Sequence, residues 1–278
     1  MKILAVIVAY HPETSLIRRN IAAFVDDVDK ILIWRNSPLN EKAIADGFSK
    51  VEFCGECANT GIPKALNYAW HHARENGYSH LLTMDQDSVW ENFRGYLDSA
   101  LAPDAPTGIF GPRINGTMGY EEYLPAGYQH MDIVPYPFVI TSGMLVSVQL
   151  IDRIGGWDEA MFVDGVDMEF VFHARELGIY TYRISGCNLI HRLGNTYKKK
   201  FLGRTYTVHN YSPARLYSLY SSHIMVMRKY PSAIIMTPLF RRQNYRQRPI
   251  RILLGEKHRF AKLAAIIRGI RDGRRAKI

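Results

Sequence analysis

The sequence predicts an α/β protein built on one mostly parallel sheet that is flanked by helices. A continuous apolar run rich in β-branched residues, which is typical of a buried parallel strand, occurs at Ile3–Ala9, and three further strand-like runs occur at 31–34, Val51–Cys54 and 81–84. A helical pattern at Ile62–Glu75 separates the third run from the fourth. Strands and helices that alternate at these lengths form right-handed βαβ units, which place parallel strands side by side in one sheet.

Further elements follow from the same periodicities, although their spacing is less regular. A helix is expected after the first strand, because four apolar residues between positions 16 and 24 recur at helical spacing. Strands are also expected at 108–111, 138–141 and 180–184, and helices at Val148–Ile154, 166–177 and Pro213–Lys229. A last helix is indicated by apolar residues at helical spacing from Phe260 to Ile270.

A basic helical extension is expected to follow the main domain, with the domain at 1–205 and the extension at 206–278. Residues 241–278 contain thirteen Lys and Arg and two acids, or +11, so the first 240 residues sum to 9 − 11 = −2. A near-neutral body with such a segment suits an anionic surface, either a membrane or a nucleic acid.

Composition predicts an ordinary globular chain with a sizeable core, since 47% of its 278 residues are apolar and 22% are charged. Three cysteines, including the lone pair Cys54 and Cys57, argue against a disulfide framework or a zinc site and favour a reducing compartment. The uncharged stretch 133–151 contains prolines and a glycine, which favour strands and turns over a membrane span. With no signal peptide evident, a cytoplasmic protein is expected.

The first candidate site is the triplet Asp85-Gln86-Asp87, which follows directly on the fourth strand. Ligands bind beyond the carboxyl ends of parallel strands, so two carboxylates there can reach one hard cation. Mg²⁺ or Mn²⁺ would neutralise the charge that develops on a departing diphosphate. A loop turn with capping Asp residues is the alternative.

The second candidate site is an acidic cluster that contains Asp164, Asp167 and Glu169 within six residues. A carboxylate near a metal site can act as the general base for an attacking hydroxyl. Acids also favour the positive end of a helix dipole, so a structural role at a helix start is compatible with this pattern. His191 follows an apolar run and could complete a metal shell, while a lone His is more often structural.

These elements in this order resemble the family 2 glycosyltransferases with the A-type fold, and within them the bacterial rhamnosyltransferase-like subgroup. The matching stretches are VIVAYHP at 6–12, NTGIPKALN at 59–67, LTMDQDS at 82–88, TSG at 141–143, GGWDE at 155–159 and the acidic cluster, with Arg175 and Gly178 behind it. The resemblance covers roughly the first 200 residues. It implies a single Rossmann-like domain that binds a nucleotide sugar and a divalent metal, Mg²⁺ or Mn²⁺.

The resemblance also implies a role for each matching position. Asp85, Asp87 and His191 would hold the metal, with Asp167 as the base and Asp164 as the second candidate. The acceptor would lie against Trp157, Asp158 and Glu159. The nucleotide sugar would contact Ala9, Tyr10, His11, Arg35, Asn36, Asn59, Gly61, Lys64, Asp85 and Gln86.

One position departs from the family pattern. The second strand commonly ends in Asp-Asn or Asp-Asp, and that first Asp contacts the base, whereas this chain has Arg35-Asn36. The expected reaction is an inverting displacement in which Asp167 deprotonates the acceptor hydroxyl. The donor would be a thymidine or uridine diphosphate sugar. Rhamnose is the sugar that the resemblance suggests, with galactofuranose, glucose or galactose as alternatives.

The acceptor is expected to be a glycan or a lipid-linked glycan, with the basic extension on the inner face of a membrane. A solvated basic helix is the alternative for that extension. Two other function classes are alternatives for the whole chain: an aspartyl-phosphate phosphatase, whose motif usually sits on the first strand, and a nucleic-acid-binding protein. No nucleic acid is expected as partner, because the basic residues lack regular aromatic interleaving.

Overall fold

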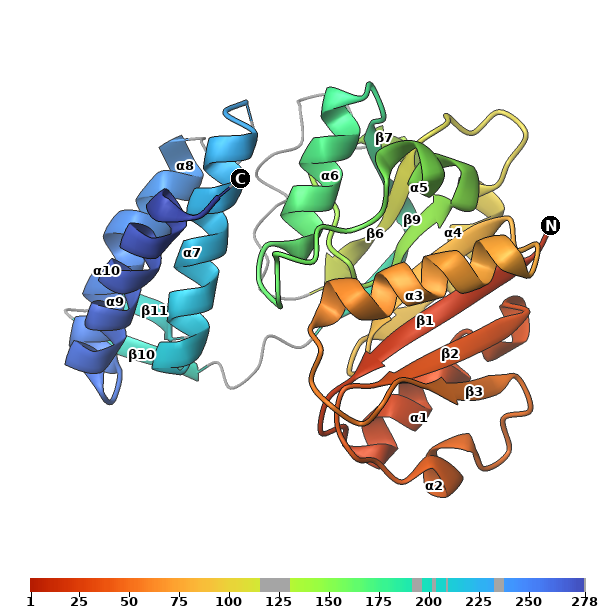
Figure 1. Ribbon diagram of the computed structural model, residues 1–278, viewed down its shortest axis with the longest axis horizontal. Coiled ribbons are helices and arrows are strands. Elements are labelled where there is room, and N and C mark those ends of the chain that lie inside the picture. Colours follow the sequence, from red (N-terminus) through yellow and green to blue (C-terminus); the bar gives the residue numbers. More distant parts are fainter. Residues whose placement is uncertain (116–130, 192–196, 202–203, 209, 233–237, 278) are drawn as a thin grey trace. The chain divides into compact units, whose positions relative to one another are not determined.

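The computed structural model describes residues 1–115, 131–191, 197–201, 204–208, 210–232 and 238–277. The chain divides into two compact units, coloured red to green and cyan to blue in Figure 1. The sheet unit comprises Met1–Phe162 and Val166–Arg192, and the helical unit comprises Leu193–Ile278 together with Val163–Gly165. The domain boundary predicted after residue 205 lies within strand β11, Arg204–Val208, and it stays a prediction.

A nine-stranded sheet forms the centre of the sheet unit, in the order β3-β2-β1-β4-β8-β6-β9-β5, with β7 pairing on β9. The described strands are β1 Ile3–Ala9, β2 Lys30–Arg35, β3 Val51–Cys54, β4 His80–Asp85, β5 Val89–Glu91, β6 Ile109–Asn115, β7 Ile133–Pro135, β8 Met144–Ser147 and β9 Thr181–Ile190. Six of them (β1, β2, β3, β4, β6 and β9) run in one direction, and β5, β7 and β8 run against it. The predicted α/β class with a mostly parallel sheet is confirmed.

The described helices of the sheet unit are α1 Thr14–Ala22, α2 Glu41–Ala45, α3 Ile62–Glu75, α4 Phe93–Ala100, α5 Val148–Ile154 and α6 Val166–Glu176. Four of these six described helices, α1, α3, α5 and α6, begin and end close to the predicted positions. The predicted helices at Ile62–Glu75 and Val148–Ile154 are confirmed. In contrast, α2, α4 and the short strand β5 carried no periodic signal that predicted them.

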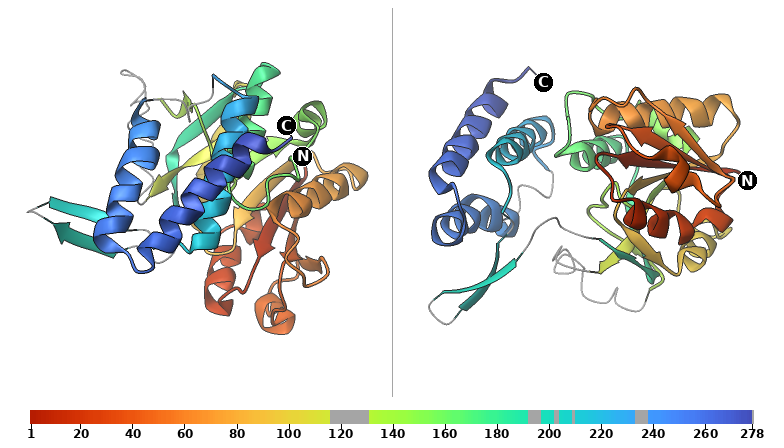
Figure 2. Two further views of the ribbon diagram at one scale, coloured as in Figure 1. Left: turned by 60° about the vertical axis from the view of Figure 1, so that its left-hand side comes forward. Right: turned by 90° about the horizontal axis from the view of Figure 1, so that it is seen from below.

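These helices cover both faces of the sheet (Figure 2). On one face, Ile17 of α1 and Phe93 of α4 belong to the same buried apolar cluster as alternate residues of β1. Those β1 residues are Ile3, Ala5 and Ile7. On the other face, α3 packs on β1 and β4 and also contacts α5. Because β1 is covered on both faces, its residues are apolar without alternation, as a buried parallel strand requires.

The strand predicted at 138–141 is wrong. This segment is irregular and lies between β7 and β8, with Gly143 at a φ of 83°. The reason is a residue from a distant part of the chain: the Thr83 hydroxyl donates to the Thr141 carbonyl at 2.5 Å, and the Gly143 N–H donates to the Thr83 carbonyl at 2.8 Å. These two bonds turn the backbone here, so it cannot continue as a strand.

The helical unit contains a strand pair and a set of packed helices. The described elements are β10 Tyr197–Phe201, β11 Arg204–Val208, α7 Pro213–Lys229, α8 Pro238–Arg241, the π-helix η5 Arg242–Gln247, α9 Arg248–Gly255 and α10 Arg259–Arg275. Two glycines let α10 approach α7 closely, because a Cβ on Gly269 or Gly273 would lie 2.5 or 2.6 Å from a carbonyl oxygen of α7. The predicted helices α7 and α10 are confirmed, and the β10–β11 pair was not predicted. None of the described helices is long and apolar enough to cross a bilayer.

Candidate active site

Two carboxylates and one imidazole gather at the carboxyl end of β4. Asp85 is the last residue of this strand, Asp87 follows two residues later, and His191 comes directly after β9. The antiparallel pairing of β5 with β9 sets Val89 opposite Ile190, which brings His191 beside the end of β4 and the turn that follows it. One ligand atom from each of the three residues lies within 4.8 Å of the others. The sequence therefore anticipated this group, which two distant strands assemble.

The donor set of this group suits a hard divalent cation. Carboxylate oxygens are the ligands that Mg²⁺ and Mn²⁺ prefer, and an imidazole can complete the shell. The side chains of Asp85 and His191 are 36% and 12% exposed, so the group is partly open to solvent. The backbone of Asp85 is held on both sides, because its carbonyl accepts from Asn20 at 2.5 Å and its N–H donates to Ser142 at 3.3 Å.

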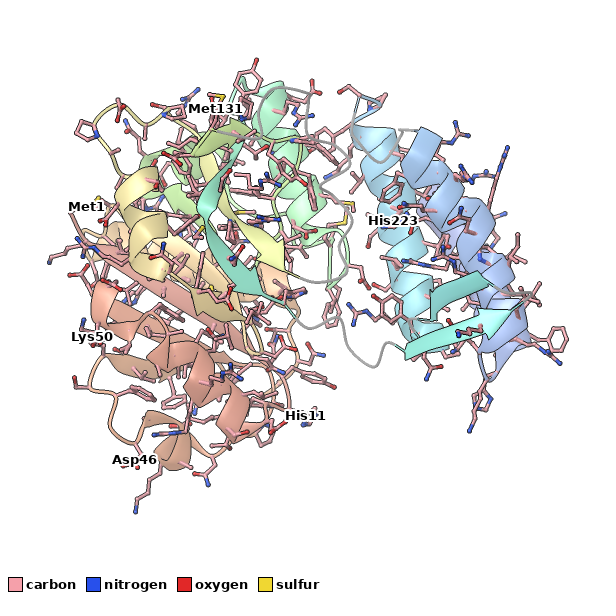
Figure 3. The ribbon with its side chains drawn as sticks, turned by 180° about the vertical axis from the view of Figure 1, so that it is seen from behind. Met1, His11, Asp46, Lys50, Met131 and His223 are labelled. Carbon is pink, nitrogen blue, oxygen red and sulfur yellow. The ribbon has the colours of Figure 1, made fainter. Side chains whose placement is uncertain are left out.

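Hydrogen bonds also tie the ends of the three neighbouring parallel strands together. The Tyr10 N–H donates to the Gln86 side chain at 2.7 Å, and Gln86 donates back to the Tyr10 carbonyl at 3.1 Å. The Ala9 carbonyl accepts from the Asn36 N–H at 2.8 Å. The ends of β1, β2 and β4 are therefore fixed at one edge of the sheet, where Figure 3 labels His11 just beyond β1.

The side chain of Asn36 connects the end of β2 to the loop before α3 at this edge of the sheet. Asn36 is only 3% exposed, and its side-chain oxygen accepts from Trp34 Nε1, from the Thr60 N–H and from the Thr60 hydroxyl at 3.0–3.2 Å. Its amide nitrogen donates to the Gly61 carbonyl at 3.1 Å. The loop before α3 is thus anchored on β2, and Asn59 adds a local bond to the Gly61 N–H at 3.2 Å. Lys64, in the first turn of α3, is exposed.

The start of α3 in turn holds the chain just before the acidic cluster. The Ile62 N–H donates to the Phe162 carbonyl at 2.9 Å, and a Cβ on Gly61 would lie 2.8 Å from that same oxygen. Only glycine fits this approach, and its φ of 84° is one that other residues rarely adopt. Hydrogen bonds, joined by single steps along the backbone, therefore connect Gln86, beside the group of Asp85, Asp87 and His191, to Phe162.

The three acids of the cluster lie in different surroundings. Asp167 is in the first turn of α6, where the helix dipole favours a carboxylate, and its Oδ1 accepts from the Met168 N–H at 2.9 Å. Glu169 is buried. Asp164 precedes the helix and belongs to the helical unit, where its carboxylate lies 3.6 Å from Arg215 Nε. Burial raises the pKa of Asp164, and the nearby Arg215 opposes that rise.

Comparisons with known proteins identify the fold. No family model matches the chain. The dTDP-rhamnosyl transferase RfbF of Shigella flexneri is 27% identical over 247 residues, which cover 82% of this chain and 80% of that protein. S. aureus TarS 1–349, solved with UDP-GlcNAc, superimposes with a TM-score of 0.56 at 12% identity over 98% of this chain and 80% of that one. GalNAc-T7, solved with UDP, GalNAc and Mn²⁺, gives 0.58 at 11% identity over 90% of this chain, which spans half of the GalNAc-T7 chain.

The chain has the A-type glycosyltransferase fold. These similarities confirm the resemblance to rhamnosyltransferase-like enzymes that the sequence motifs indicated. Within this glycosyltransferase fold, Arg35 takes the position where an acid is common. Its guanidinium donates to Glu41 at 2.5 Å, to the Gly55 carbonyl at 2.6 Å and to the Cys54 carbonyl at 3.3 Å. Arg35 therefore links the end of β2 to the end of β3, and all three of its guanidinium nitrogens donate hydrogen bonds within the protein.

The residues expected to border the acceptor are held by α3 of the glycosyltransferase fold. The Asn67 side chain donates to the Trp157 carbonyl at 2.9 Å and to Glu159 at 3.0 Å, and it accepts from the Trp157 N–H at 2.8 Å. The Trp157 ring is buried and stacks on Phe170 at 4.3 Å. Asp158 accepts from the Ala160 N–H at 2.9 Å. Trp157 is therefore a packing residue, whereas Asp158 and Glu159 are partly or fully exposed.

Sequence reasoning missed several residues that support this site. Asn67 and Ser142 lie within the stretches that match the family, and that position was the sequence signal that could have marked them as supporting residues. Asn20, which holds the Asp85 carbonyl from 65 positions away, lies outside those stretches and was not singled out. A buried amide on an otherwise apolar helix face is the pattern that could have drawn attention to it.

Proposed function

We propose that this protein is a metal-dependent glycosyltransferase that moves a sugar from a nucleoside diphosphate to an acceptor hydroxyl. The observation that carries this proposal is the group of Asp85, Asp87 and His191 at the carboxyl edge of the sheet in an A-type fold. The similarity to a dTDP-rhamnosyl transferase favours thymidine diphosphate rhamnose as donor. A uridine diphosphate hexose is the alternative, because UDP-sugar enzymes share the fold.

The donor would bind at the edge formed by the ends of β1, β2 and β4. Tyr10 and His11 would border the base and ribose, while the metal-ligand group would hold the cation. A bound divalent cation would neutralise the negative charge of the diphosphate. Arg35, Asn36 and Asn59 would act by shaping the loops around the nucleotide, since their side chains already bond within the protein.

Asp167 is the proposed general base, and the products would have inverted configuration. An acceptor hydroxyl that attacks from the face opposite the diphosphate needs one group to take its proton, and no enzyme nucleophile. Asp164 is the second candidate, although its burial and its pairing with Arg215 favour a role in holding Val163–Gly165 to the helical unit. Asp158 and Glu159 would contact the acceptor.

Removing one metal ligand is expected to abolish metal-dependent donor binding. At a ligand concentration 100 times its Kd, a bound nucleotide stabilises a protein by about 2.7 kcal/mol. We expect thymidine diphosphate with Mn²⁺ to raise the thermal midpoint of the wild type and of the control Asp104→Ala, whose carboxylate is exposed. Asp87→Ala should lose this increase. A variant that keeps the full Mn²⁺-dependent shift would remove Asp87 from the metal site.

The acceptor is proposed to be a lipid-linked glycan, with the helical unit on an anionic membrane. Three apolar residues share one exposed face of α9, namely Ile250, Leu253 and Leu254. On α10, Phe260 and Ile267 are 73% and 67% exposed. These helices lie in the segment that carries +11, so apolar contact and attraction to anionic headgroups would act together.

Polar substitutions on α9 are expected to weaken membrane binding. Replacing Ile250, Leu253 and Leu254 by Ser removes the exposed apolar face and keeps every charge. We expect at least a tenfold loss of binding to vesicles of phosphatidylglycerol and phosphatidylcholine, because several buried CH₂ groups contribute about 0.8 kcal/mol each. Leu177→Ser, on an exposed residue of the sheet unit, is the matched control. Equal binding by the triple variant and the control would exclude this face as the membrane contact.

A further inference from the structure

Two buried hydroxyls connect the ligands of the metal-ligand group. Ser88 and Ser142 are both fully buried, and the Ser142 hydroxyl donates to the Ser88 oxygen at 2.8 Å. Ser88 Oγ lies 2.9 Å from His191 Nδ1, within hydrogen-bond distance. At the other end, Ser142 Oγ accepts from the Asp85 N–H at 3.3 Å. The hydroxyl pair thus joins the backbone of one ligand to the ring of another.

The hydroxyl proton of Ser142 points along this hydrogen-bond chain toward Ser88. Ser142 Oγ accepts from the Asp85 N–H, which can only donate, and its own proton goes to Ser88 Oγ. The Ser88 hydroxyl, which accepts from Ser142, can then form its second hydrogen bond with His191 Nδ1. Both buried hydroxyls are satisfied in this way, which matters because an unpartnered buried hydroxyl costs about 1–3 kcal/mol.

Ser142 is held rigidly by the turn in which it stands. The turn residues on both sides bond to Thr83 of β4, and the Gly143 carbonyl also accepts from the Tyr96 hydroxyl at 2.9 Å. A Cβ on Gly143 would lie 2.8 Å from the ring of Pro112, so the turn is enclosed on that side as well. The hydroxyl of Ser142 is therefore a fixed point against which Ser88 and His191 are placed.

The ring nitrogen held by Ser88 has a second polar neighbour. His191 Nδ1 lies 3.6 Å from Asp85 Oδ2, a longer distance than the 2.9 Å to Ser88. Without the Ser88 hydroxyl, this carboxylate oxygen is an acceptor that Nδ1 could reach by a small rotation of the ring. A direct bond between the two would engage a carboxylate oxygen that a cation needs.

We propose that Ser88 and Ser142 are positioning residues for the divalent metal: they hold the His191 ring by Nδ1, so that Nδ1 bonds to Ser88 at 2.9 Å and stays 3.6 Å from Asp85 Oδ2. This inference rests on the proposed metal-dependent function. Partners that orient a metal-binding histidine affect metal affinity by about 10–100-fold when they are removed. Ser88→Ala and Ser142→Ala are therefore expected to weaken metal binding although neither hydroxyl is a ligand.

The test is Mn²⁺ affinity, measured by the electron paramagnetic resonance signal of free Mn²⁺ in the presence of thymidine diphosphate. We expect the Kd for Mn²⁺ to rise at least tenfold in Ser88→Ala and Ser142→Ala. Ser88→Cys and Ser142→Cys keep a similar side-chain shape but bond weakly, so they should show the same direction of change. Ser99→Ala removes a hydroxyl that donates to a helix carbonyl in α4 and should leave the Kd unchanged.

A double-mutant cycle separates positioning from general destabilisation. In a His191→Ala background, Ser88→Ala should cause no further loss of Mn²⁺ affinity, because Ser88 acts through the His191 ring that it contacts. Unchanged affinity in both Ser→Ala variants, or an equal loss in the His191→Ala background, would overturn the proposal. If the wild type itself does not bind Mn²⁺, the proposed function fails. If the wild type binds Mn²⁺ and both Ser→Ala variants bind it equally well, the proposed function stands and this inference fails.

Discussion

Asp167→Asn is expected to lower the turnover number by about a thousandfold while donor binding is retained. A positioned general base contributes about 10²–10⁴-fold to a rate, and an amide of the same shape cannot accept the proton. The donor would be bound through other residues, so its Kd should change by less than about threefold. The measurement is steady-state transfer, with a donor chosen by screening thymidine and uridine diphosphate sugars, beside nucleotide binding by calorimetry.

Two comparisons make the Asp167 result specific. Glu176→Gln changes an acid at the far end of the same helix and should keep full turnover. Asp164→Asn tests the second candidate base, and we expect a smaller loss of turnover than for Asp167→Asn. Full transfer by Asp167→Asn would exclude Asp167 as the base. A loss of turnover confined to Asp164→Asn would assign that role to Asp164.

The helical unit is expected to lose stability steeply as the pH falls below about 6.5. His223 in α7, labelled in Figure 3, is 3% exposed and has a partly aromatic environment that includes Tyr220 and Phe240. Burial, with a smaller contribution from the positive charge of Arg248, lowers its pKa to about 3. The folded state therefore resists protonation of this ring, whereas the unfolded chain takes up the proton near its ordinary pKa of 6.5.

The sign follows from that difference in pKa. A depressed folded-state pKa gives a contribution to stability that is present above pH 6.5 and is lost as the pH falls toward 3. Between about pH 6.5 and 4.5 the loss would be roughly 2–3 kcal/mol, at about 1.4 kcal/mol for each pH unit.

Denaturant unfolding at several pH values, followed for the wild type and His223→Gln, measures this loss of stability. The variant should show a shallower pH dependence, because it lacks the group that titrates. His71→Gln, on an exposed ring, should match the wild type. Equal slopes for the wild type and His223→Gln would contradict the assignment.

Much of the fold could be predicted because its signals are local. A buried parallel strand needs apolar residues on both faces, so β1 is visible as an unbroken apolar run from Ile3 to Ala9. The same reasoning placed Asp85 and Asp87 at the end of β4. The segment 138–141 was predicted wrongly because its composition suits a strand, while hydrogen bonds to Thr83 turn its backbone instead.

Local patterns were enough to predict the α/β class, the positions of the first four strands along the chain and the polar residues that follow them. Which of those polar residues meet depends on contacts between distant segments. His191 lies near Asp85 because β5 pairs with β9, Arg35 bonds to the carbonyls at the end of β3, and Asp164 pairs with Arg215 of the helical unit. Each of these arrangements brings together residues that are apart in sequence, and strand register and packing, which no local pattern encodes, decide which residues meet.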